Sequence, residues 1–121
     1  MKMEVTESTN SNPSTKVKSR DLLIFQLGVI IDMKYKGNNA KPRIDKAFQL
    51  LKEGKVILYE DNSLRARVEG NDTYYTNLSA NTCTCMDKAH NLEKEELCKH
   101  LWAHKFAHEI EIGVIKLEGV Q

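Results

Sequence analysis

Three cysteines and one histidine in the second half of the chain form two pairs with the same internal spacing. One residue separates Cys83 from Cys85, one residue separates Cys98 from His100, and twelve residues lie between the two pairs. In an extended segment, residues two apart point the same way, so each pair presents two ligand atoms on one side of its backbone. Three thiolates and one imidazole are a usual ligand set for a structural zinc ion, which binds four ligands tetrahedrally. The pattern therefore predicts one structural Zn²⁺ held by these four side chains.

His100 is expected to be the fourth ligand in preference to His104 and His108. It follows Cys98 at the spacing that relates Cys85 to Cys83. Cys98 and His100 also open a predicted helix, where unpaired N–H groups and the positive end of the helix dipole favour a thiolate. Four protein ligands leave no coordination position for a zinc-activated water, so we expect no enzymatic activity.

Three other interpretations of the cysteines stay open. They could be small buried apolar residues, with His100 an ordinary surface histidine. One cysteine could be a nucleophile paired with a histidine, although that chemistry needs only one activated thiol. Cys83 and Cys85 could form a redox dithiol, although two residues more often separate such sulfurs. The odd cysteine count, far below that of a disulfide scaffold, favours metal or thiol chemistry in a reducing, intracellular compartment such as the cytoplasm.

The elements that must position these side chains are predicted from periodicity. Apolar residues recur at three- and four-residue intervals after Pro42, and Gly54 stands where a helix-ending glycine belongs, which predicts an amphipathic helix. Beyond it the period changes to two, as in short antiparallel strands, and a last apolar stripe predicts a C-terminal helix with His104 off the stripe. The expected elements are a helix at 42–53, strands at 56–59, 64–68 and 73–78, and a helix at about 99–109.

The predicted fold class is α+β, a small single domain in which an amphipathic helix precedes a three-stranded antiparallel sheet and a zinc-anchored C-terminal helix. With 121 residues, 40% of them apolar and 29% charged, the chain fits one domain. Neither a membrane span nor a signal peptide is expected. The predicted parts are a disordered, basic-ended tail at 1–20, an apolar segment at 21–36, a zinc finger unit at 42–110, and a C-terminal strand or tail at 111–121. We interpret the apolar segment as helix, although periodicity does not separate it from a buried strand.

The stretch from Tyr74 to Ala103 resembles a SWIM-type zinc finger, whose signature is C-x-C, a variable loop and then C-x-H. The resemblance extends over about residues 42–107. The sequence departs from the family at Met86-Asp87-Lys88, where many members have proline, aspartate and an aromatic residue, and at Asn81, where glycine is common. The resemblance implies a non-catalytic module that binds DNA or protein, of the kind found in helicase-like ATPases, transposase-related factors and recombination accessory proteins. The chain itself has no phosphate-binding loop of the G-x-x-x-x-G-K-[ST] form.

The charges are distributed unevenly and favour DNA as the partner. Residues 1–55 contain 11 Lys and Arg against 6 Asp and Glu, whereas residues 56–121 contain 7 against 11. Clustered basic residues contact phosphates, so an accessory or regulatory role in DNA transactions is our first hypothesis. The alternative is a protein-interaction adaptor that uses the apolar 22–31 segment for a partner or for self-association. The residues expected on the DNA-binding face are Lys41, Arg43, Lys46, Arg65, Arg67 and Lys99.

Overall fold

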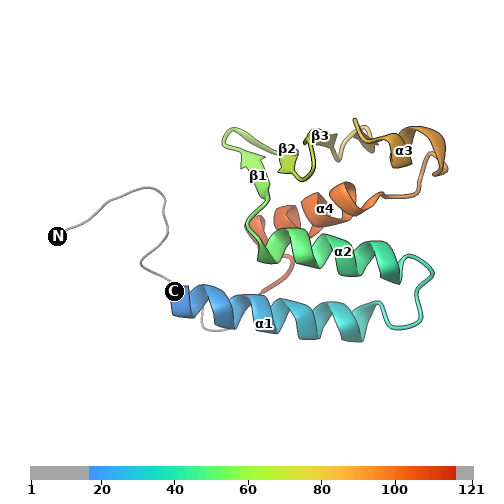
Figure 1. The fold of residues 1–121 in the computed structure, drawn as a ribbon. Helices are drawn as coiled ribbons and strands as arrows, with labels where there is room; N and C mark the ends of the chain where they lie inside the picture. The colour runs from blue at the N-terminus through green and yellow to red at the C-terminus, as the bar shows by residue number, and fades with distance from the viewer. Residues whose placement is uncertain (1–16, 117–121) are drawn as a thin grey trace. The chain divides into compact units, whose positions relative to one another are not determined.

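The computed structural model describes residues 17–116, and their side chains from residue 24 onward. Residues 34–116 form one compact unit, and the helix that precedes them is described by itself (Figure 1). The elements are α1 (Val17–Lys34), α2 (Lys41–Lys52), β1 (Val56–Tyr59), β2 (Asn62–Glu69), β3 (Thr73–Asn77), β4 (Thr82–Cys83), α3 (Met86–His90) and α4 (Lys99–Glu111).

Helix α1 covers most of the apolar segment predicted at 21–36. It begins at Val17, so residues 17–20, which the prediction assigned to the tail, are helical. Residues 1–16 of that tail lie outside the described part of the chain. Apolar residues occur on all sides of this helix, which explains why periodicity alone did not distinguish it from a buried strand.

Helix α2 and the antiparallel sheet confirm the predicted fold class. The helix lies one residue N-terminal to its predicted bounds, has proline in its first turn, and buries Ile44 and Ala47. The strand order is β1-β2-β3-β4, with every neighbouring pair antiparallel. The sheet therefore has a fourth strand beyond the three expected, and that strand carries a residue of the predicted zinc site.

Helix α4 packs on one face of the sheet and also contacts α2 (Figure 1). On β2, Ala66 and Val68 are buried, while Arg65 and Arg67 alternate with them and point to the opposite face. Since α4 has neighbours on two sides, more of its surface is buried than one apolar stripe requires. The expectation that His104 lies off the buried stripe was wrong, because this side chain is fully buried.

Helix α4 ends at Glu111, and residues 112–116 form no strand. Of the segment predicted as strand or tail at 111–121, the described part is therefore not a strand, and residues 117–121 lie outside the described residues. Among the helices of residues 17–116, none has the length and apolar character needed to cross a membrane.

Candidate metal centre

Two short elements position the first cysteine pair. Strand β4 pairs with β3 so that Cys83 lies opposite Thr76. The preceding turn contains Asn81 with a left-handed φ of 57°, a conformation that asparagine tolerates where glycine is common. Cys85 has extended backbone and is the N-cap of α3, where its Sγ accepts a hydrogen bond of 3.4 Å from the Lys88 backbone N–H.

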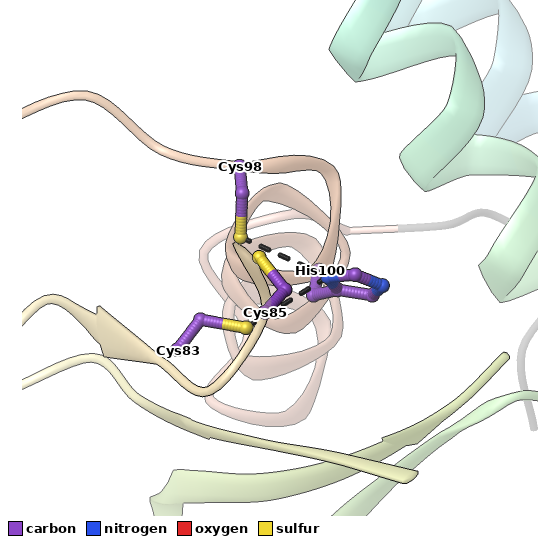
Figure 2. A group of neighbouring side chains, drawn as sticks. All are labelled: Cys83, Cys85, Cys98 and His100. Carbon is purple, nitrogen blue, oxygen red and sulfur yellow. Dashed lines mark hydrogen bonds between the residues drawn. The ribbon is translucent and has the colours of Figure 1, made fainter. Parts of the chain in front are cut away.

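The second pair lies at the start of α4. Cys98 is the N-cap, with extended backbone, and His100 lies in the first helical turn. The extended geometry predicted for both residues of this pair holds for Cys98 only, because His100 is helical. Helix initiation turns the imidazole toward the sulfurs instead (Figure 2).

The four side chains converge on one point from β4, from the N-caps of α3 and α4, and from the first turn of α4 (Figure 2). One ligand atom from each of Cys83, Cys85, Cys98 and His100 lies within 4.8 Å of the others. The Nδ1 atom of His100 is 3.7 Å from Cys83 Sγ and 3.9 Å from Cys98 Sγ. Bond lengths of about 2.3 Å to sulfur and 2.0 Å to nitrogen give a zinc tetrahedron edges of about 3.5–3.8 Å. The two N–S separations are close to these edges, so the cluster could hold one metal ion.

The acid–base state of the thiols also suits a cation. A hydrogen bond with Cys83 is the main cause that lowers the pKa of Cys98 to about 4. The same interaction raises the pKa of Cys83, and burial raises that of Cys85. The three neighbouring thiols thus do not all lose their protons together, because several adjacent thiolates would repel one another. A divalent cation would remove this conflict and let all three ionise.

An apolar shell surrounds the cluster and fixes the imidazole. The ring of Tyr74 stacks on that of His100, with centroids 4.2 Å apart and an interplanar angle of 27°. Cys85 and Cys98 are buried with Leu101. The sequence placed Tyr74 only in the strand predicted at 73–78, and it gave no sign of the stacking. The side chains packed around these buried residues are Tyr74, Leu78, Cys83, Leu92 and Leu97.

Lys88 organises the loop that joins the two ligand pairs. Its ammonium donates to the backbone carbonyls of Glu93, Lys94 and Glu96, at 3.1, 2.8 and 2.5 Å. Asn81 Nδ2 donates to the Lys94 carbonyl as well, at 2.6 Å. Lys88 thus ties the loop between Glu93 and Glu96 to α3, and Asn81 ties the same loop to the turn before β4. Nothing in the spacing of the sequence indicated this role.

The other two C-terminal histidines have partners away from the cluster. His104 Nε2 donates to the Ser63 carbonyl at 2.9 Å, which leaves Nδ1 to accept from the Thr76 hydroxyl at 2.7 Å. Burial lowers the pKa of His104, which favours the neutral ring that this pattern needs. His108 Nδ1 forms a 2.8 Å hydrogen bond with Ser63 Oγ. The structure therefore brings His100, and neither of these two, to the cysteines.

The basic residues expected on a DNA-binding face lie in three places. Arg43 and Lys46 belong to α2, which contacts α4, whereas Arg65 and Arg67 lie on the sheet face opposite α4. Lys99 lies at the start of α4 beside His100, where both line a surface cavity of about 280 Å³. Lys41 forms a 2.9 Å ion pair with Asp45 one turn along its own helix. The six residues thus come from three elements, α2, β2 and the first turn of α4.

Comparisons of the chain with protein-family models, with curated proteins and with solved structures found no match.

Proposed function

We propose that the chain is a non-catalytic zinc-binding module of the SWIM type that binds DNA. The observation that carries the zinc assignment is the convergence of three sulfurs and His100 Nδ1 within 4.8 Å. If the cysteines were only small buried apolar residues, nothing would require three sulfurs to lie around one imidazole nitrogen. The C-x-C and C-x-H spacing and the strand before the first pair support the SWIM type.

A structural zinc ion agrees best with this donor set. Sulfur and imidazole ligands select zinc over magnesium or calcium, which prefer oxygen. With four protein ligands, the ion would have no open position for water or substrate, which supports a role without catalysis. The thiols are free of disulfides, and such a site is maintained most easily in a reducing compartment.

Elemental analysis of the purified chain tests the zinc assignment. We expect one zinc per chain, and we expect Cys98→Ser to lose it, because an alcohol is a much poorer zinc ligand than a thiolate. His100→Ala should also lose the metal, while the matched variant His104→Ala should keep it. Retention of zinc by His100→Ala together with its loss in His104→Ala would contradict the ligand set.

Binding to a DNA duplex in a titration of salt concentration tests the partner. The support for DNA is Arg43 and Lys46 on α2 and the two arginines on the sheet, because phosphate contacts release counterions and make affinity fall steeply with salt. The double variant Arg65→Ala with Arg67→Ala should weaken binding, and Lys52→Ala, on the exposed end of α2, serves as the control. An affinity for DNA that neither salt nor the double variant changes would contradict this part of the proposal.

The second candidate is a protein-interaction adaptor. One observation favours it: Phe25, Val29 and Met33 repeat every four residues on α1 and are exposed. Single apolar residues on a surface are ordinary, but a stripe of three large ones is typical of interaction faces. Light scattering over a range of concentrations distinguishes the cases, since self-association through this stripe would raise the apparent mass and Phe25→Ser would reverse it.

A further inference from the structure

The face of the sheet opposite α4 carries both aromatic rings and arginines. On β2, Arg67 lies directly opposite Ile57 of β1 and Tyr75 of β3, so these three side chains form one row across the strands. Arg65 lies two residues along β2 on the same face, and its guanidinium is 5.8 Å from the centre of the Tyr59 ring. We call these five residues, Ile57, Tyr59, Arg65, Arg67 and Tyr75, the sheet platform.

The rings of the sheet platform are accessible. Tyr75 is 50% exposed and Tyr59 is 40% exposed, because α4 packs on the other face. Arg67 pairs with Glu69 at 3.0 Å, but the two side chains are 43% and 48% exposed. An ion pair so open to water contributes little, so a phosphate could replace the carboxylate.

We propose that the sheet platform binds single-stranded nucleic acid, with bases stacked on Tyr59 and Tyr75 and phosphates held by Arg65 and Arg67. This proposal rests on the proposed DNA-binding function and names its substrate class. Exposed rings on an open sheet can stack on the flat face of a base. Unpaired strands expose those faces, whereas duplex bases are already stacked on one another. The arginines supply the charge complementarity that a purely apolar protein partner would not use.

The spacing of the two rings fits separate bases of one strand. Tyr75 and the residue opposite it on β1 are two strands apart, and Tyr59 lies two residues further along β1. Two strand spacings of about 4.8 Å each put Tyr75 and the β1 residue opposite it about 10 Å apart, and Tyr59 follows beyond the register shift that lies between Leu58 and Tyr59. Two bases of one extended chain can therefore stack at the same time, with an arginine between them.

The fluorescence anisotropy of labelled oligonucleotides on the zinc-loaded full chain tests the proposal. The probes are an oligo(dT) strand of about 12 nucleotides, an oligo(U) strand and a DNA duplex of the same length. We expect either or both single strands to bind more tightly than the duplex, with the two strands telling DNA from RNA. Tyr59→Thr and Tyr75→Thr should each weaken single-strand binding about ten-fold, and Arg65→Ala should lower the salt slope by about 0.7.

Two further variants separate stacking from a structural role of the rings. Tyr75→Leu keeps an apolar side chain on the strand and should lose affinity like Tyr75→Thr. Tyr75→Trp should keep affinity, and oligo(dT) should quench the added emission relative to the parent protein, which a merely structural ring would not show. Zinc content and circular dichroism confirm that each variant is folded, and Phe25→Ser is the control for an exposed ring outside the platform.

The outcomes distinguish this proposal from the function on which it rests. Equal binding of duplex and single strand, unaffected by Tyr75→Leu but weakened by Arg43→Ala with Lys46→Ala, would overturn the sheet platform and leave DNA binding in place. Absence of binding to all three probes would overturn both. A preference for single strands that disappears in Tyr59→Thr and Tyr75→Thr would support both.

Discussion

Substitution of Lys88 by methionine should weaken zinc binding although every proposed ligand remains. The ammonium of this residue donates to three backbone carbonyls of the loop between Glu93 and Glu96. Methionine keeps most of the length of the side chain and removes all three donors. The backbone N–H of residue 88, which donates to Cys85 Sγ, is unchanged, so the first ligand pair keeps its own hydrogen bond.

The expected magnitude follows from these contacts. Each hydrogen bond contributes about 0.5–1.5 kcal/mol net, and the lower value applies because the ammonium lies at the surface. Three such bonds give about 1.5 kcal/mol. The twelve residues between the ligand pairs must be ordered before Cys98 and His100 reach the cluster, so a loop without this anchor has to be ordered when metal binds. A loss of about 1.5 kcal/mol corresponds to a zinc affinity about ten-fold lower.

Competition with a chromophoric chelator at fixed pH measures this effect. The matched control is Lys94→Met, because that side chain belongs to the same loop and the carbonyl of residue 94, not its ammonium, takes part in the hydrogen bonds. We expect the control to bind zinc as the parent chain does. Equal affinities for the parent and Lys88→Met would refute the argument that the ammonium preorganises the loop.

Three further predictions concern stability and the metal. Burial lowers the pKa of His104 in the folded chain below its ordinary 6.5, so the unfolded chain binds the extra proton. The free energy of unfolding should therefore fall as pH drops below about 6.5, by at most about 1.4 kcal/mol per pH unit. His104→Gln should remove this part of the pH dependence in urea titrations of zinc-loaded protein, and the same pH dependence in parent and variant would argue against it. Ile44→Ala should lower the free energy of unfolding by about 3 kcal/mol in the same titrations, because the side chain is fully buried, and a loss below about 1 kcal/mol would contradict its place in the core. Chelation of zinc should increase amide hydrogen exchange in residues 82–98 while β1, β2 and α4 stay protected, and uniform loss of protection would show that the metal holds the whole unit.

Local signals in the sequence were enough to predict the helices and strands that have clear periodicity. Pro42 and the apolar spacing placed α2 to within one residue at each end. Val56–Tyr59 was predicted with the bounds that the structure gives to β1. In these segments, side-chain periodicity and burial agree, because each element has one buried face.

The elements that sequence reasoning missed are those stabilised by contacts from outside themselves. Strand β4 has two residues and α3 has five, too few for any period to appear. Pairing with β3 and the Cys85 cap stabilise them. His104 was misplaced for a related reason: its polarity suggested exposure, whereas two partners distant in sequence, Ser63 and Thr76, satisfy both ring nitrogens.

For the candidate site, the identities of the four residues were predictable and their surroundings were not. The spacing selects Cys83, Cys85, Cys98 and His100, and the structure brings the same four together. The stacking of Tyr74 and the loop contacts of Lys88 depend on segments that meet only after folding. Tyr74 and Lys88 stand at no fixed spacing from the ligands, because their partners are a ring and backbone carbonyls and not residues of the same motif.

Side-chain hydrogen bonds and the cysteine cluster join different parts of α4 to the sheet, and this arrangement determines what a metal ion would stabilise. His104 connects the middle of α4 to β2 and β3 through hydrogen bonds that need no metal. The cysteine cluster connects the start of the same helix to β4 and α3. Thr84, between the first two cysteines, also accepts a hydrogen bond from the Tyr75 backbone N–H at 3.1 Å. The metal would therefore stabilise the edge of the sheet platform beside Tyr75, while the hydrogen bonds of His104 stabilise the sheet on which the platform lies.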